Sequence, residues 1–166
     1  MDGPAPFTDR EAQFLEALVV EGVEFLVVWL AAAALQGAPA VTQDIDLWFR
    51  DLTDPRLQRA LRRAGATYIP PAEDHPPLLA GGGAGLFDVV THMHGLRSFA
   101  LEARRALRVP LGRVEVPVLP LDRIIASKRA TDRPKDRAIL PVLEDALLVL
   151  QSRRKPRRTS RKGRSK

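Results

Sequence analysis

Residues 41–49 constrain the fold more than any other part of the chain, because they place two acids inside an otherwise apolar stretch (Val-Thr-Gln-Asp-Ile-Asp-Leu-Trp-Phe). This pattern predicts a buried β-strand. Successive side chains of a strand point to opposite faces, so Asp44 and Asp46 share one face while Ile45 and Leu47 share the other. Neighbouring carboxylates repel each other unless a cation lies between them, and a divalent metal ion commonly does so. The alternative is a strand edge at which both aspartates contact only water.

Composition limits the class of protein. A length of 166 residues fits a single domain with its own core, and an apolar share of 45% is ordinary for a soluble globular chain. The longest apolar run, residues 25–35, is too short to cross a bilayer and lies inside the chain, so neither a membrane span nor a signal peptide is predicted. The absence of cysteine excludes disulfides, a thiol nucleophile and Cys-ligated zinc, and the inferred location is cytoplasmic.

The net charge of +6 comes from the end of the chain. Residues 152–166 carry nine Lys or Arg and no acid, which leaves 17 basic and 20 acidic residues in the rest of the chain. Such a tail buries too little apolar surface to offset its ordering entropy, so we predict one folded domain over residues 1–151 and a disordered basic tail over residues 152–166. The tail can bind RNA or DNA through phosphates. The alternative is a solubilising end without a specific partner.

Hydrophobic periodicity and capping signals predict an alternation of helices and strands. Helices are predicted at residues 8–20, 31–35, 54–65, 121–130 and 136–150, and strands at residues 24–28, 41–49, 86–91 and 113–118. Residues 70–85, rich in Pro and Gly, predict a loop in which Gly81 to Gly83 form a flexible connection. The order predicts the α/β (α+β) class, with a mixed β-sheet flanked by helices.

A third acid, Asp88, lies between Phe87 and Val89 in the predicted strand 86–91. Burying an unpaired carboxylate costs several kcal/mol, so Asp88 needs a cation, hydrogen-bond donors or a place facing a cleft.

The Asp44-x-Asp46 pair, Asp88 and the preceding Ala-rich segment together resemble the nucleotidyltransferase superfamily that includes DNA polymerase beta. The closer resemblance is to its small prokaryotic members, among them the AbiE-type toxin nucleotidyltransferases and related uncharacterised single-domain proteins. Residues 25–49 match the spacing of that family, and residues 119–143, with Ala126-Ser-Lys-Arg129 and Arg133-Pro-Lys-Asp136, resemble its closing helices. The resemblance covers most of residues 7–150 and excludes the tail.

The resemblance implies a polymerase-beta-like fold and the transfer of a nucleoside monophosphate from an NTP to a hydroxyl acceptor. Asp44 and Asp46 would hold Mg²⁺ ions that bridge to the phosphates, and Asp88 would complete the second metal site and help to deprotonate the acceptor. The acceptor could be RNA such as a tRNA end, a protein side chain or a small molecule. Toxin-type relatives also imply a cognate antitoxin as partner.

The departures from the family pattern are informative. Trp29-Leu30 stand where paired glycines are expected, Gln36 stands where a His is expected, and Ala40 stands where a basic residue is common. Glycine lets backbone N–H groups approach a triphosphate closely, whereas an indole obstructs that approach. Of the group only Gly37 remains, and it is equally a plain helix C-cap. The alternative function is therefore a catalytically degenerate binding or regulatory module.

Further residues are expected around the nucleotide. The expected set is Trp29, Leu30, Gly37, Thr42, Lys128 and Lys135. For each lysine the competing interpretation, which carries more weight, is a solvated helix face. Asp136 is interpreted as an acid that favours a helix N-terminus, and His92 and His94 as turn or surface residues rather than metal ligands.

Overall fold

Helices and strands alternate along most of the chain in the computed structural model, which describes residues 7–154. The helices are α1 (Asp9–Val20), α2 (Trp29–Leu35), α3 (Pro55–Arg63), α4 (Phe99–Ala103), α5 (Leu121–Thr131) and α6 (Pro134–Arg154). The strands are β1 (Phe25–Val28), β2 (Ile45–Phe49), β3 (Ala66–Ile69), β4 (Leu78–Gly81), β5 (Phe87–Val90), β6 (Leu107–Leu111) and β7 (Val114–Val118).

The strands form one seven-stranded sheet in the order β3-β4-β5-β2-β1-β7-β6. The pairs β2–β5 and β1–β7 are parallel, and the remaining pairs are antiparallel. The predicted mixed sheet flanked by helices is therefore confirmed.

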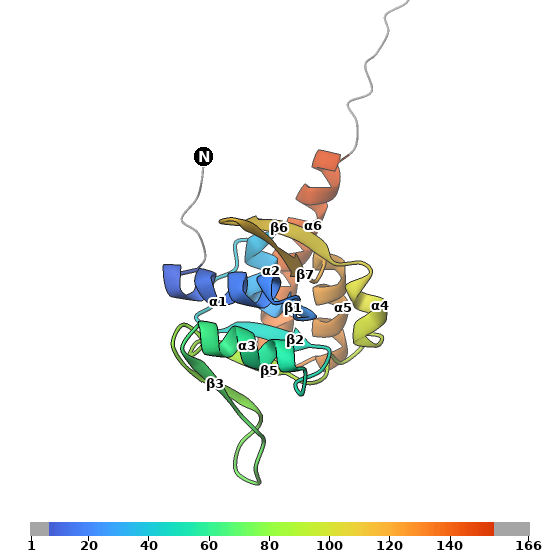
Figure 1. Cartoon of the computed structure of the whole chain (residues 1–166). Helices are drawn as coiled ribbons and strands as arrows, with labels where there is room; N and C mark the ends of the chain where they lie inside the picture. Colours follow the sequence, from blue (N-terminus) through green and yellow to red (C-terminus); the bar gives the residue numbers. More distant parts are fainter. Residues whose placement is uncertain (1–6, 155–166) are drawn as a thin grey trace, which may run out of the picture.

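Two groups of helices cover the sheet. Helices α1 and α3 pack against each other, and α5 packs against α6 and α2. Figure 1 shows α1 and α3 in front of the central strands and α6 behind them. The central strand β1 is buried along its whole length. Trp48 on β2 belongs to the core and packs edge-on against Phe99, with 5.3 Å between ring centres.

Two predicted helix starts are confirmed by their caps. The Thr8 hydroxyl accepts a hydrogen bond from the Glu11 N–H, and the Glu11 carboxylate accepts one from the Thr8 N–H, which is a capping box. At α3 the Asp54 carboxylate accepts from the Arg56 N–H at 2.8 Å, and Pro55 occupies the first helical turn.

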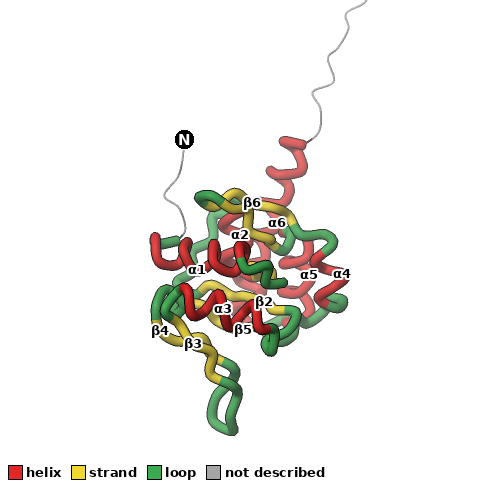
Figure 2. The backbone as a smooth tube through the Cα atoms, viewed as in Figure 1, coloured by secondary structure: helices red, strands yellow, loops and turns green. Residues whose placement is uncertain are grey.

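The prediction of a loop over residues 70–85 was wrong in part. Strand β4 lies inside this stretch and pairs with both β3 and β5, so that β3 and β4 form a hairpin. Figures 1 and 2 show the hairpin extending away from the rest of the molecule. Strand β3, helix α4 and strand β6 were not predicted either.

The triple glycine is a closely packed turn rather than a flexible connection. A Cβ atom on Gly82 would lie 1.9 Å from the Ala64 carbonyl oxygen, and one on Gly83 would lie 2.2 Å from the Arg10 carbonyl oxygen. The glycines are present because backbones approach each other here.

Helix α6 continues to Arg154, which includes the first three residues of the predicted tail. The remainder of that tail, residues 155–166, lies outside the described part of the chain. Within residues 7–154 no helix combines the length and the apolar character that crossing a bilayer demands.

Candidate active site

Asp46 and Asp88 lie side by side at one edge of the sheet. Strand β2 places Asp46 opposite Val28 of β1 on one side and opposite Asp88 of β5 on the other. Neighbouring strands are about 4.8 Å apart, and residues in register on a parallel pair share a face. The sheet therefore brings together two acids that are 42 positions apart in the sequence numbering.

Asp44 lies just before β2, whose first residue is Ile45. The Thr42 hydroxyl donates to the Asp44 carbonyl oxygen at 2.9 Å and accepts from the Asp44 N–H at 3.3 Å. Asp44 is exposed in this local turn. Thr42 fixes the backbone of Asp44 through these two hydrogen bonds. Asp44 and Asp46 are therefore not two members of one regular strand, although both line the same pocket.

The acids perturb one another. Burial, followed by the charge of Asp88, raises the pKa of Asp46 to about 6, while Lys128 opposes the rise. Partial burial and the charge of Asp44 also raise the pKa of Asp88. Both shifts show that negative charge at this edge of the sheet lacks full compensation.

The donor chemistry of this edge fits Mg²⁺. Carboxylate oxygens are the ligands that Mg²⁺ prefers. Burial and the charges of neighbouring acids raise the pKa values of Asp46 and Asp88, and a cation at this edge of the sheet would compensate that negative charge. Among residues 7–154, no three or more His, Cys, Asp or Glu side chains lie together so that they could hold a metal ion as a group. Magnesium sites in enzymes usually take one or two carboxylates, with waters and substrate phosphates completing the shell.

Trp29 adopts a backbone conformation that normally requires glycine. It follows β1 directly, opens α2 and has a φ of 53°. A side-chain-bearing residue pays about 1–2 kcal/mol in this left-handed region. The backbone thus follows a path suited to the expected glycine, while the indole lines the pocket beside the acids together with Leu30.

Lys128 is held by two neighbours and is not on a solvated helix face, so that interpretation was wrong. Its residue exposure is 7%, its ammonium group donates to Asp136 at 2.8 Å, and the same group lies 4.3 Å from the centre of the Trp29 ring. Lys135, by contrast, is exposed. Its charge, like that of Lys128, lowers the pKa of Asp46.

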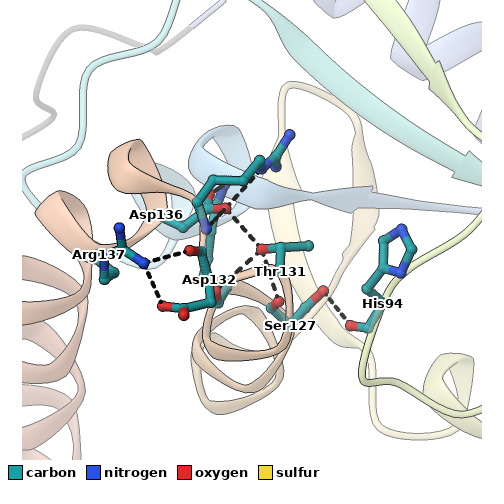
Figure 3. A network of polar contacts seen from close by, with 8 residues as sticks. His94, Ser127, Thr131, Asp132, Asp136 and Arg137 are labelled. Carbon is teal, nitrogen blue, oxygen red and sulfur yellow. Dashed lines mark hydrogen bonds and ion pairs between the residues drawn. The ribbon is translucent and has the colours of Figure 1, made fainter.

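Asp136 is the centre of a buried polar network, drawn in Figure 3. The carboxylate is fully buried and accepts hydrogen bonds from Lys128, from the Thr131 hydroxyl and from the Arg133 side chain, each at 2.8 Å. Burial alone would raise the pKa of Asp136, but these donors overcome it and hold the pKa well below the ordinary value. Asp136 lies in the first turn of α6 as predicted, yet its main contacts are these side chains.

One pocket of ≈ 960 Å³ collects most of the predicted site. The predicted residues that line it are Trp29, Leu30, Thr42, Asp44, Asp46, Asp88, Lys128 and Lys135. Gly37 is not among its lining residues. With a φ of 90° after the C-cap Gln36, Gly37 ends α2, which agrees with the C-cap alternative.

Other pocket residues were not predicted. Arg133, Thr131, His92 and His94 line the same pocket, and only the strand parity of the histidines with Asp88 gave a sequence signal for them. Gln36, at the position where a His was expected, has a structural role. Its amide donates to the Leu119 carbonyl and accepts from the Leu121 N–H, both at 2.9 Å, so it joins α2 to the start of α5.

No protein-family model matches the sequence, and none of the curated proteins matches it. Several solved structures resemble the chain, among them two structures of ANT(2″)-Ia. One is the crystal structure of ANT(2″)-Ia in complex with adenylyl-2″-tobramycin, with 14% identity and a TM-score of 0.53 over 85% of this chain and 94% of that one. The other is the solution structure of the antibiotic-resistance factor ANT(2″)-Ia, with 15% identity and a TM-score of 0.52 over 87% of this chain and 90% of that one. This chain has a nucleotidyltransferase fold. At this identity the likeness concerns the fold alone.

Proposed function

We propose that this chain transfers a nucleoside monophosphate from an NTP to a hydroxyl acceptor. The observation that carries the proposal is the pairing of Asp46 with Asp88 across β2 and β5, at a pocket that also contains Asp44. The fold supports it, as does the adenylyl-2″-tobramycin bound to the neighbouring structure, which is an adenylylated small molecule.

In the proposed reaction the acceptor oxygen forms a bond to the α-phosphorus, and the bond from that phosphorus to the bridging oxygen breaks, so that pyrophosphate leaves with the electron pair. Asp88 is placed to take the hydroxyl proton, because it faces the pocket and its raised pKa makes it a better base. Mg²⁺ held by one or two of the carboxylates of Asp44, Asp46 and Asp88, with waters and substrate phosphates completing its shell, would neutralise phosphate charge during transfer. Lys135, an exposed cation in the pocket lining, would contact the phosphates.

The proposal is tested by incubating the protein with Mg²⁺, α-³²P-labelled NTPs and total cellular RNA and protein. Label should appear on one acceptor class, and Asp46→Asn and Asp88→Asn should each lower transfer by at least ~100-fold. Asp74→Asn is the matched control, because that side chain is 88% exposed in the distant β3–β4 hairpin. Equal labelling by Asp46→Asn and the wild type would contradict the proposal.

The second candidate is a degenerate member that binds a ligand without catalysing transfer. It is favoured by the Trp29 ring, which replaces the expected glycine and covers Lys128. Calorimetry separates the two: heat of binding for an Mg–NTP pair supports the enzyme, whereas no heat with any of the four NTPs supports the alternative.

Several finer expectations belong to this proposal. They are RNA binding through the basic tail, a cognate antitoxin of the toxin–antitoxin kind, and a cytoplasmic location. Deleting residues 155–166 should remove RNA binding that depends on the tail at low salt and leave the pocket chemistry in place.

A further inference from the structure

One wall of the pocket runs from the catalytic acids to a pair of histidines. Asp88, Val90, His92 and His94 are alternate residues, and all four line the pocket. Met93, between the two histidines, has only 1% exposure and faces the core. An extended chain rises about 3.3 Å per residue, so the Cα atom of His92 lies at most about 13 Å from that of Asp88. The histidines therefore line the pocket beyond the end of β5, whereas Asp88 lies within that strand.

The loop that carries the histidines is fixed on α5. The Ser127 hydroxyl donates to the His94 carbonyl oxygen at 2.6 Å, as drawn in Figure 3. A Cβ atom on Gly95 would lie 2.4 Å from the Cβ atom of Ala130. The two imidazole rings meet edge-on with 4.7 Å between their centres. Their position is thus preformed, which lowers the entropy cost of binding a ligand.

Arg133 lines the same pocket from the turn between α5 and α6. The Thr131 hydroxyl bonds both the Ser127 carbonyl at 3.2 Å and the Asp136 carboxylate at 2.8 Å. Ser127 and Thr131 are about one helical turn apart, so the His94 loop and the Arg133 turn are fastened to neighbouring turns of α5. The Arg133 Nε donates to Asp136, and its side chain remains 51% exposed.

The charges in this part of the pocket favour an anion. Of the carboxylates that line the pocket within residues 7–154, three are the proposed catalytic acids, and the fourth, Asp136, already accepts bonds on both oxygens. Beyond the acids the wall offers imidazole and guanidinium N–H groups and no free carboxylate. An ammonium group finds no counter-ion here, whereas a phosphate finds several donors.

We infer that His92, His94 and Arg133 form a phosphate subsite for the acceptor, so that the acceptor is a phosphate-bearing molecule such as a nucleotide or the end of a nucleic acid. The inference rests on the proposed function, because the acceptor that it describes is the hydroxyl acceptor of that transfer. During transfer the acceptor's hydroxyl oxygen bonds to the α-phosphorus and pyrophosphate leaves. The acceptor's own phosphate is unchanged and serves to hold it.

The first test uses the imidazole signals of the protein in NMR. The chain has three histidines, and His75 in the β3–β4 hairpin is an internal reference outside the pocket. Adenosine monophosphate and a pentaribonucleotide with a free 3′ hydroxyl are titrated separately. We expect the His92 and His94 signals to move and the His75 signal to stay. A response to adenosine monophosphate, to the pentaribonucleotide or to both supports the subsite and identifies the ligand that it accepts. No response to either ligand overturns the inference.

The second test is calorimetry on the double variant His92→Gln with His94→Gln. Pentaribonucleotide binding should weaken by roughly tenfold, while Mg–NTP binding and the His75→Gln control stay within about twofold. Equal loss of Mg–NTP binding would assign the histidines to the donor nucleotide and overturn the inference.

The outcomes separate this inference from the proposed function. If the double variant loses pentaribonucleotide binding but no variant transfers label, the proposed function fails and the subsite stands. A different result would reject the inference alone. In that result, label passes to tobramycin, whose amines are cationic, and never to the ribonucleotides, and the double variant labels tobramycin as fast as the wild type does. The inference then fails and the proposed function stands.

Discussion

The ammonium group of Lys128 lies 4.3 Å from the centre of the Trp29 ring. The contact joins the residue that replaces the expected glycine to a lysine whose charge is already bound by Asp136 at 2.8 Å. The Trp29 indole and the Asp136 carboxylate both contact this ammonium group. A phosphate would therefore have to displace the Trp29 ring to reach Lys128. Trp29 and Lys128 therefore act as one unit at the back of the pocket.

Replacing Trp29 with glycine tests this unit. Trp29→Gly should remove about 1–2 kcal/mol of left-handed strain and lose a cation–π contact of about 0.5–2 kcal/mol. It also loses the packing of the indole against the core, so stability should fall. Calorimetry should show Mg–NTP binding at least ~10-fold tighter, because Lys128 becomes accessible. Any transfer gained should disappear in the double variant with Asp44→Ala.

Trp48→Phe is the control for loss of an indole, because Trp48 is buried in the core with 6% exposure. It should lower the melting temperature without tightening nucleotide binding. Unchanged binding in Trp29→Gly would show that the ring does not obstruct the nucleotide.

Asp136 should make stability depend on acid. Its pKa is held below the ordinary value, chiefly by Lys128 and Arg133 against the opposing effect of burial. The contribution of Asp136 to the free energy of unfolding is therefore complete above the unfolded pKa of about 3.9. It is lost as the pH falls toward the lower folded pKa. Asp136→Asn should cost about 3 kcal/mol in unfolding free energy at pH 7, because it leaves Lys128 without its buried counter-charge. Urea titrations should show a smaller difference at pH 2.5, and an equal difference at both values would contradict this role.

Asp46 should show the opposite pH dependence in metal-free protein. Its pKa is raised to about 6 by burial and by Asp88, so ionisation costs stability as the pH rises from about 4 to 6. Asp46→Asn should abolish this loss of stability with rising pH. Since protons compete with Mg²⁺ for the carboxylate, Mg²⁺ should raise the melting temperature more at pH 7.5 than at pH 5, and EDTA should reverse the rise. An Mg²⁺ effect that persists in Asp46→Asn would place the metal elsewhere.

Gly95 should be intolerant of a side chain. Gly95→Ala introduces a Cβ atom 2.4 Å from the Cβ of Ala130, at a φ of 71°. Gly112→Ala is the matched control, because its φ is 58° but nothing lies within 4 Å. The control should cost about 1 kcal/mol from the backbone alone, and Gly95→Ala should cost at least ~1 kcal/mol more from the clash. Thermal unfolding measures both, and equal costs would show that the His94 loop adapts.

The sheet and the acidic edge were predictable because they depend on local pattern. Alternation predicted β2 and β5, Thr8 and Asp54 marked helix starts, and the position of Asp88 in a second strand placed it near Asp46. Strand β4 was not predictable in this way, since it follows two prolines and is stabilised by pairing with β3 and β5.

The far side of the pocket depends on tertiary contacts and could not be predicted. Lys128 has the local sequence of a solvated helix position, but the turn after α5 brings Asp136 to its ammonium group. The same turn places Arg133 in the pocket, and no periodic pattern links it to His92 or His94.

The positive φ of Trp29 also bears on how the chain can change. Because the backbone already has the shape that glycine adopts, this chain and a glycine-bearing relative differ at this position in a side chain rather than in a fold. The tryptophan codon and one glycine codon differ by a single base. One base change is therefore enough for Trp29→Gly, which would remove the indole from the pocket lining without any rearrangement of the sheet.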